Sequence, residues 1–326
     1  MSVGAFSTPV NNLKRKSKTS LNGSLSASPM ISIPPSPFLK KLGWGTGVSV
    51  YLYERSPKND GSPRSPWAVK KLLKRTVVPA ETVKERLKYE ADILKRVNHP
   101  NVVGYRGYIK DKNGVPCLIM ENGEISLYDL IEARIENNQG SFPAKQVHKV
   151  AVSVLNALRC LHTQHKLLHG DLKSANVLVA NNFESIKLCD FGVSLKLKDD
   201  LTGLEDPIDR YIGTAAWNCK ESFENGPITD KADMYSFGLV LWEMITLLVP
   251  HTSNMDLDCT ISDDDDSFDG EDLQSLFGTQ PPLPDTFEPE YQPLLELIAM
   301  CTSEDPDVRP SASTALQALQ SLQFSS

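Results

Sequence analysis

Four polar side chains near the middle of the chain have the types and spacing needed for phosphoryl transfer. Asp171 carries a carboxylate that can accept a proton from an incoming hydroxyl group. Lys173 can neutralise charge on the phosphoryl group in transfer. Asn176 and Asp190 carry side-chain oxygens, which are the ligand atoms that magnesium prefers. We therefore predict that Asp171, Lys173 and Asn176 are catalytic, and that Asn176 and Asp190 bind magnesium on a nucleotide.

These side chains lie in two motifs that resemble a known family. Residues 169–176 (HGDLKSAN) are similar to the catalytic loop of eukaryotic protein kinases, and residues 190–192 (DFG) are similar to their metal-binding turn. Gly170 departs from the pattern, because most such kinases carry Arg at this place. An unrelated polar loop would have to produce the same residues at the same spacing by chance, so we favour the kinase interpretation.

The same resemblance implies how ATP would be held. Residues 43–50 (GWGTGVSV) lie between two predicted strands, and their glycines let backbone N–H groups lie over the phosphates. The family pattern places its third glycine one position later than Gly47. Lys70 resembles the strand lysine that contacts the α- and β-phosphates, and Glu90 resembles its ion-pair partner. The implied ATP contacts are Leu42, Gly43, Gly45, Gly47, Val50, Ala68, Lys70, Glu90, Met120, Glu121 and Asp190.

Further motifs of this kind follow in the second half of the chain. Thr214 is expected to contact the catalytic loop. Glu221 is expected to form a buried ion pair with Arg309, and Asp233 resembles the aspartate that holds the backbone of that loop. Lys71, by contrast, is expected to be solvated on the outer face of its strand.

Hydrophobic periodicity indicates the elements that position these motifs. Strands are predicted within residues 42–53, 67–73 and 117–120. Apolar residues at helical spacing predict helices at 80–97, 127–136, 144–165, 234–248, 293–301 and 312–322. These patterns indicate an α+β protein, and the resemblance to eukaryotic protein kinases implies the bilobal protein kinase fold. Its small β-rich N-lobe would span residues 38–120, and its larger helical C-lobe would span 121–322.

Several segments differ in composition from the predicted kinase domain, 38–322. Residues 1–37 are rich in Ser, Pro and Lys and are expected to be disordered. Within this tail, Thr8 precedes proline and is a candidate site for an upstream proline-directed kinase. Residues 253–272 form an acidic loop insertion, and 323–326 form a short tail. PDZ ligands end in a hydrophobic residue, whereas this chain ends in serine, which makes a PDZ partner doubtful.

The bulk composition limits the class of protein further. The chain has 326 residues, of which 40% are hydrophobic, and a net charge of −7, as is ordinary for a soluble, packed protein. No apolar run approaches the roughly 20 residues needed to cross a bilayer. The six cysteines are scattered, which favours reduced thiols. We expect cytoplasmic and nuclear localisation and neither a nucleic acid nor a membrane as partner.

The predicted function follows from the resemblance, which covers residues 38–322. It implies an ATP- and Mg²⁺-dependent protein kinase that phosphorylates Ser or Thr. Residues 191–195 (FGVSL) resemble the MAP kinase kinase branch, which leaves dual specificity open and implies MAP kinase substrates in mitotic or proliferation signalling. Two alternatives are a pseudokinase scaffold that docks signalling partners without turnover and a small-molecule kinase with the same fold.

Gly170 also leads to a prediction about regulation. In kinases with Arg before the catalytic Asp, that cation is paired by a phosphate on the activation segment. Because Gly170 supplies no cation, we expect activity to depend less on such a phosphate. Thr202 is the candidate phosphorylation site in this segment.

Overall fold

The computed structural model describes residues 40–251 and 275–320, apart from 46, 74–77 and 284–287. These residues belong to one compact unit. The predictions for the N-terminal tail with Thr8, for the acidic insertion and for residues 323–326 lie outside the described residues. The predicted domain boundaries stay predictions.

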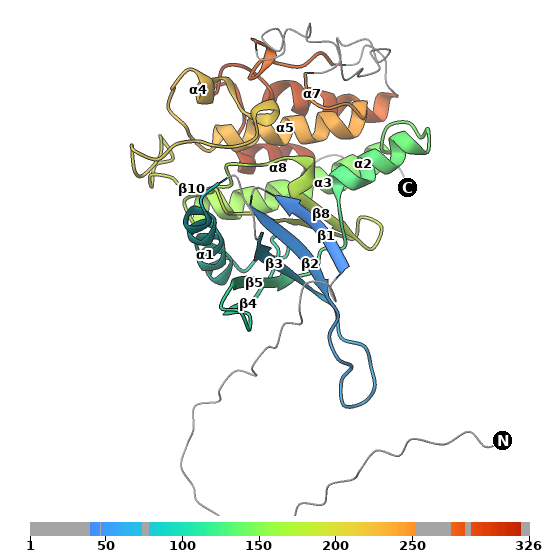
Figure 1. The fold of residues 1–326 in the computed structure, drawn as a ribbon. Helices are drawn as coiled ribbons and strands as arrows, with labels where there is room; N and C mark the ends of the chain where they lie inside the picture. The colour runs from blue at the N-terminus through green and yellow to red at the C-terminus, as the bar shows by residue number, and fades with distance from the viewer. Residues whose placement is uncertain (1–39, 46, 74–77, 252–274, 284–287, 321–326) are drawn as a thin grey trace, which may run out of the picture. The chain divides into compact units, whose positions relative to one another are not determined.

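An antiparallel sheet forms the N-lobe, with the strands in the order β1-β2-β3-β5-β4 (Figure 1). The strands are β1 (Lys40–Gly45), β2 (Val48–Tyr53), β3 (Trp67–Leu72), β4 (Tyr105–Lys110) and β5 (Pro116–Glu121). Helix α1 (Ala80–Arg96) packs on β4 and β5. It buries Val83, Leu87 and Ile93, as its helical periodicity predicts.

Strand β4 is an element that the sequence patterns do not predict. It lies at the edge of the sheet, and all of its residues are at least partly exposed. Without a fully buried face, an edge strand shows no clear alternation of apolar and polar residues, so its sequence carries a weak signal.

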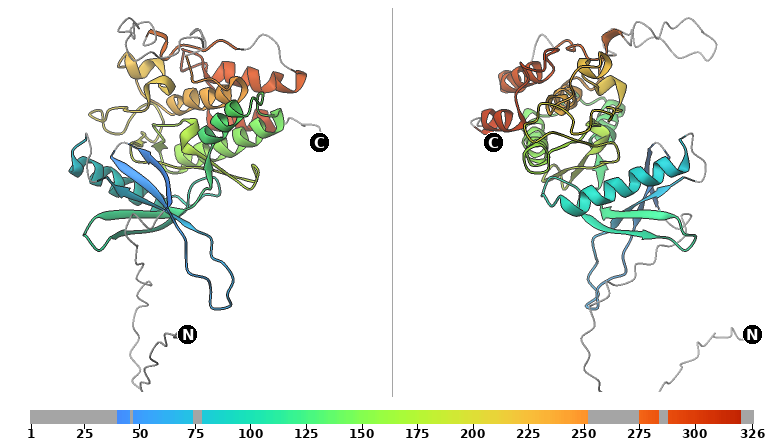
Figure 2. Two further views of the ribbon diagram at one scale, coloured as in Figure 1. Left: turned by 45° about the vertical axis from the view of Figure 1, so that its right-hand side comes forward. Right: turned by 90° about the vertical axis from the view of Figure 1, so that its left-hand side faces the viewer.

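The C-lobe is mainly helical, and Figure 2 shows its helices gathered on the side of the molecule opposite the sheet. The helices are α2 (Leu127–Glu136), α3 (Ala144–Arg159), α4 (Lys220–Phe223), α5 (Lys231–Thr246), α7 (Gln292–Cys301) and α8 (Ala312–Gln320). The helix predicted for 144–165 ends as α3 at Arg159 and continues as a π-helical turn, Cys160–Gln164. Two small sheets complete the lobe: β6 (Ile125–Ser126) with β8 (Val177–Ala180) and β9 (Ser185–Leu188), and β7 (Leu167–Leu168) with β10 (Leu195–Lys196).

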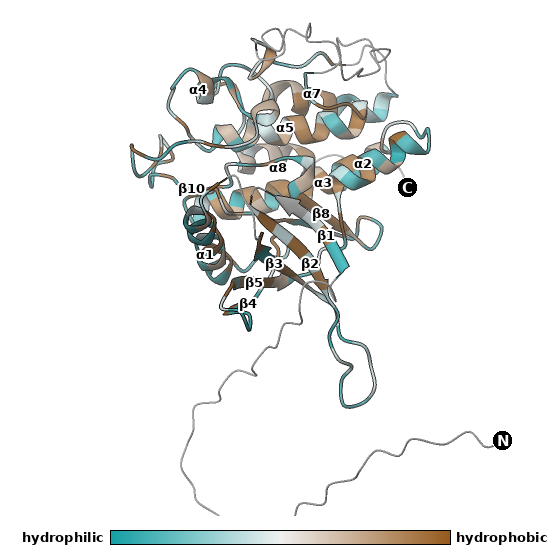
Figure 3. Cartoon of the chain, viewed as in Figure 1, coloured by the Kyte–Doolittle hydropathy of each residue, from teal (hydrophilic) through white to brown (hydrophobic). Residues whose placement is uncertain are grey.

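Helix α5 is the centre of the C-lobe. Every residue from Ala232 to Ile245 is buried, and the helix contacts both α3 and α7. A helix that is apolar on all sides must be enclosed by other elements. Figure 3 shows this contrast, since α1 is largely hydrophilic on its outer side whereas α5 carries hydrophobic colours along its length. Because α5 is enclosed, the polar side chains on it are held in fixed places.

The expectation that Lys71 is solvated is wrong. Lys71 is 5% exposed, and its Nζ lies 3.1 Å from Oδ2 of Asp111, which follows β4. Lysine is buried in this way only when a carboxylate compensates its charge, and the strand pattern alone does not reveal the partner. Among the described residues, no helix has both the length and the apolar character needed to cross a bilayer.

Candidate active site

Asp233, in the first turn of α5, fixes the backbone of the loop that follows β7. Its carboxylate accepts hydrogen bonds from the N–H groups of His169 (2.7 Å) and Gly170 (3.0 Å). His162 Nε2 lies 2.8 Å from the same carboxylate, which is fully buried. Burial alone would raise the pKa of Asp233, but these partners outweigh burial and lower it. The expected role of Asp233 is confirmed by these bonds.

The local structure of this loop explains why position 170 is a glycine. Its φ is +79°, and a Cβ atom at this position would lie 3.0 Å from the carbonyl oxygen of Val193. A side chain here would therefore be strained both by the left-handed backbone and by the close approach of the segment after Asp190. The residue that departs from the family pattern is the one that lets this segment pack closely on the loop.

Asp171 lies within a set of polar contacts. Its Oδ1 accepts a hydrogen bond from the hydroxyl of Thr214 (2.6 Å), and Lys173 Nζ lies 3.0 Å from its Oδ2. Lys173 also donates to Thr214 (2.7 Å), so the expected contact of Thr214 with the catalytic loop is confirmed. Asn176 Nδ2 donates to the carbonyl (2.7 Å) and to Oδ2 (3.2 Å) of Asp171. The structure thus brings together all of the predicted residues of this loop.

Lys70 joins the N-lobe to the segment after β9. Its Nζ lies 2.8 Å from Glu90 Oε2 on α1 and 2.8 Å from Asp190 Oδ1. Burial raises the pKa of Glu90 to about 7, even though Lys70 lowers it. Burial disfavours the charged form of Lys70 as well, but the charges of Asp190 and Glu90 outweigh it and raise its pKa. Burial alone would raise the pKa of Asp190, but the charge and hydrogen bond of Lys70 outweigh burial and lower it. Lys70 therefore forms ion pairs with two carboxylates and keeps Asp190 ionised.

The residues present fit a bound magnesium ion. Asp190 uses Oδ1 for Lys70 and the N–H of Gly192, and within the described residues its Oδ2 accepts no hydrogen bond. The amide of Asn176 donates through Nδ2, and in the same part of the chain its oxygen accepts none. Two hard oxygen donors thus remain for a cation that keeps its other positions for phosphate and water.

The predicted nucleotide contacts lie on the sheet around Lys70. Gly43 and Gly45 belong to β1, Leu42 is 37% exposed on the same strand, and Val50 lies opposite Lys70 on β2. Gly47 lies in the turn between β1 and β2 and has a φ of +82°. Ala68 pairs with Met120 between β3 and β5, and both are buried. The carboxylate of Glu121 lies 3.4 Å from Lys187 and 3.7 Å from Arg106.

The activation segment, residues 190–221, ends in a buried ion pair. Arg309 donates to both oxygens of Glu221, at 2.7 and 3.0 Å, and its guanidinium lies over the ring of Tyr235. The ion pair expected between Glu221 and Arg309 is confirmed.

Comparison with known proteins agrees with this arrangement. The model of the protein kinase domain matches residues 37–320. The chain belongs to the protein kinase family. Lymphokine-activated killer T-cell-originated protein kinase from Homo sapiens is 47% identical over 324 residues, which are 98% of each chain. A probable serine/threonine-protein kinase from Dictyostelium discoideum is 30% identical over 284 residues, which are 87% of this chain and 24% of the relative. Human mitogen-activated protein kinase kinase kinase 13 is 31% identical over 177 residues, which are 53% of this chain and 17% of the relative.

One polar residue of this kinase site was missed at the sequence level. Glu243 on α5 accepts hydrogen bonds from Ser174 Oγ (2.7 Å) and Trp217 Nε1 (2.8 Å), so it connects the catalytic loop to the activation segment. Burial raises the pKa of Glu243 to about 7. A carboxylate within the apolar run that follows Asp233 on α5 is the signal that would have found it, because a buried acid needs polar partners.

Proposed function

We propose that this kinase transfers the γ-phosphoryl group of ATP to serine or threonine hydroxyls of protein substrates. The observation that carries the proposal is the position of Asp171, which Thr214, Lys173 and Asn176 surround within 3.2 Å. A carboxylate held in this way can orient an incoming hydroxyl and accept its proton without moving.

The nucleotide would be oriented by Lys70 and the β1–β2 hairpin of the N-lobe. Lys70 stands between Glu90 and Asp190 and can place its ammonium group on the phosphates. The β1–β2 hairpin supplies glycine backbone for the phosphates, and Asn176 and Asp190 would hold magnesium. When bound, magnesium would neutralise charge that develops on the phosphates. The chain therefore contributes positioning and charge neutralisation, and no covalent intermediate is needed.

The substrate class rests on the second half of the site. Lys173 contacts both Asp171 and Thr214, where it can neutralise the transferring group, and its presence at this place is typical of serine/threonine kinases. Trp217 and the Glu221–Arg309 pair order the segment that would receive a peptide. We further propose a MAP-kinase-kinase-like role in mitotic or proliferation signalling, with MAP kinases as substrates, control by a proline-directed kinase at Thr8, and cytoplasmic and nuclear localisation.

Replacing the proposed base tests the function directly. Asp171→Asn keeps the side-chain shape but cannot accept the proton, so the initial rate should fall about 10²- to 10⁴-fold. Nucleotide affinity should change little, because Lys70 and Asp190 are intact. Rates would be measured with purified chain, ATP, Mg²⁺ and a generic protein substrate, and binding would be measured by calorimetry.

The matched control is Asp307→Asn, which removes a carboxylate at an exposed position between α7 and α8. This variant should keep the parent rate. If Asp171→Asn phosphorylated protein as fast as the parent, Asp171 would not be the base. If the parent bound ATP without any phosphorylation of protein, the pseudokinase scaffold would be the better description.

A further inference from the structure

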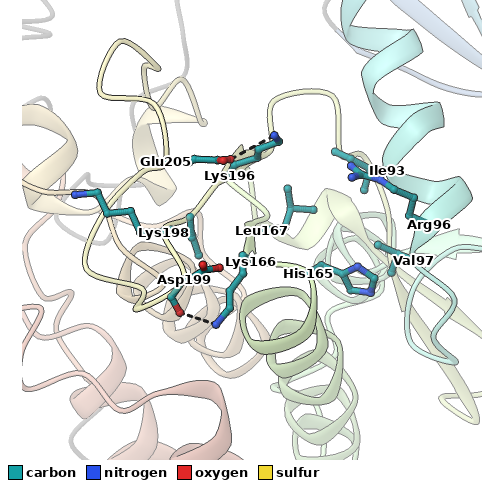
Figure 4. Close-up of a pocket in the computed structure, with 11 residues that line it drawn as sticks. Ile93, Arg96, Val97, His165, Lys166, Leu167, Lys196, Lys198, Asp199 and Glu205 are labelled. Carbon is teal, nitrogen blue, oxygen red and sulfur yellow. Dashed lines mark hydrogen bonds and ion pairs between the residues drawn. The ribbon is translucent and has the colours of Figure 1, made fainter.

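Two adjoining cavities lie between α1 and the first part of the activation segment, outside the site described above. The first has a volume of about 460 Å³ and is lined by Arg96 and Lys166 (Figure 4). The second has a volume of about 610 Å³ and is lined by Tyr89 and Asp209. Both are large enough to take several side chains of a peptide. They adjoin at Lys196 and Glu205, which line both.

The two cavities form one groove, and the first cavity is its basic end. Lys and Arg side chains from α1, the residue before β7 and the activation segment outnumber the two carboxylates that line it, Asp199 and Glu205. Arg96 donates through Nε to the carbonyl of Asp92, and Lys166 donates to the carbonyl of Asp199 (2.7 Å). Neither cation has a carboxylate within 4 Å in the described part of the chain, so their charge is available to an anionic ligand.

The base of this first cavity is apolar. Ile93, Leu167 and Leu197 line it and are at most 4% exposed. In Figure 4, Arg96 and His165 lie on one side of this cavity, across from the interaction of Lys166 with the activation segment. An apolar side chain between two acidic ones would therefore find both a hydrophobic contact and cations here.

The second cavity is the acidic end of the groove. Its lining contains the carboxylates of Glu205, Asp206 and Asp209 against the single cation of Lys196. Among the described residues, Asp206 and Asp209 have no basic partner within 4 Å. Burial raises the pKa of Tyr89 on α1, the charges of Asp209 and Glu205 raise it further, and Arg96 of the first cavity lowers it. A basic side chain would thus be favoured at this end.

Only a weak contact separates the two ends. Lys196 Nζ lies 3.3 Å from Glu205 Oε2, and the two side chains are 55% and 59% exposed. Exposed ion pairs of this kind contribute little, so a ligand can replace this pair with contacts of its own. The ends of the groove therefore carry opposite charge without being closed off from one another.

We propose that these two cavities form a docking surface for an extended segment of a protein partner with polarised charge. Acidic side chains of the segment would lie at the Arg96 end, and basic side chains would lie at the Tyr89 end. The occupant is inferred from charge complementarity, which sets register and suppresses wrong partners. Bound there, the segment would contact α1, which carries Glu90, together with the activation segment. This surface goes beyond the proposed function and does not depend on it.

A random peptide library tests this surface, because selection from it requires no identified partner. Twelve-residue peptides displayed on phage would be selected against the full chain, and the dissociation constants of enriched peptides would be measured by fluorescence anisotropy. We expect enriched peptides with Asp or Glu toward one end and Lys or Arg toward the other. Arg96→Glu and Asp209→Lys should each weaken their binding at least tenfold.

The matched control is Lys95→Glu, an equal change of charge at the neighbouring exposed position of α1 that lines neither cavity. This variant should bind the peptides as the parent does, and thermal unfolding would confirm that all variants fold. Enriched peptides without polarised charge, or equal binding by the Arg96→Glu and Lys95→Glu variants, would overturn the proposal. Because the readout is binding, its failure is distinct from a failure of phosphoryl transfer.

Discussion

Two buried glutamates make the stability of this folded kinase depend on pH. Glu90 and Glu243 are 1% and 3% exposed, and burial raises the pKa of each to about 7. A carboxyl group whose pKa rises on folding binds its proton more tightly in the folded chain. The stability that this proton contributes is present below pH 4.5 and is lost as pH rises toward 7.

The variant Glu243→Gln tests this dependence, because an amide does not titrate. We expect each of these glutamates to contribute a fall of about 1–3 kcal/mol to the free energy of unfolding between pH 4.5 and 7. The neutral form of the buried His251, whose pKa burial lowers to about 4, contributes in the opposite direction over the same range in parent and variant alike. The difference in free energy of unfolding between parent and variant, measured by urea unfolding at several pH values, should therefore shrink by this amount as pH rises. The control Glu296→Gln, at an exposed position on α7, should keep the profile of the parent. If the free energy of unfolding fell more steeply with pH in Glu243→Gln than in the parent, the raised pKa of Glu243 would be refuted.

Single residues differ in how far the sequence predicts their roles. Asp171, Asn176 and Asp190 are predictable, because their chemistry needs a fixed spacing along one loop and one turn. Lys71 and Glu243 are not, because their burial depends on partners far away in the chain. Periodicity indicates which face of an element is apolar, but only packing decides which polar residue becomes enclosed.

The activation segment is ordered by backbone hydrogen bonds over residues 196–205, here called the activation hairpin. The N–H of Glu205 donates to the carbonyl of Lys196 (2.8 Å), and Leu197 pairs with Leu204. The hairpin is attached to the C-lobe by the N–H of Leu197, which donates to Lys166 (2.8 Å), and by the pairing of β10 with β7. None of these contacts requires a phosphate group.

Two substitutions in the activation hairpin test this form of order. Thr202 is exposed, and among the described residues its hydroxyl donates to Asp200 alone, so Thr202→Ala should keep the initial rate within about threefold of the parent. Leu197 is 3% exposed, and Leu197→Ala should cost about 2–5 kcal/mol of packing and lower the rate more strongly. Both rates would be measured on phosphatase-treated protein. Loss of all activity in Thr202→Ala would show that the segment does need a phosphate there.

Helices and strands were predictable from the sequence where one face of the element is buried. The predicted range 127–136 equals that of α2, because Ser126 caps its start and the apolar spacing persists to its end. The turn Cys160–Gln164 was predicted as ordinary α-helix, since the change to π-helical hydrogen bonds leaves the apolar spacing almost unaltered. β4 was missed because an edge strand needs no apolar face.

Contacts between distant parts of the chain hold the whole molecule in the arrangement that the site needs. Lys70 links the sheet of the N-lobe to Asp190, and Val102 forms a bridge with Leu188 at the end of β9. In the C-lobe, Arg309 brings the connection between α7 and α8 onto the end of the activation segment. The Glu221–Arg309 pairing was expected from the resemblance to protein kinases. The other two pairings do not follow from local patterns, because each joins segments far apart in the sequence.

Loss of the Glu221–Arg309 pair should lower the stability of the whole fold. Arg309→Met would leave Glu221 buried without its cation, and breaking a buried pair in this way costs about 3–5 kcal/mol. Urea unfolding would show this cost as a lower midpoint. The neighbouring pair Lys220–Glu304 is the matched control, since its side chains are 41% and 45% exposed. Lys220→Met should cost no more than about 1 kcal/mol.

A double variant separates the two ways in which Arg309 could stabilise the fold. Glu221→Gln combined with Arg309→Met removes the unpaired charge as well as the cation, so part of the lost stability should return. If the double variant were as unstable as Arg309→Met alone, the packing of Arg309 on Tyr235 and its bonds to backbone carbonyls would be the main contribution. If Arg309→Met cost no more than Lys220→Met, the buried pair would not hold the activation segment.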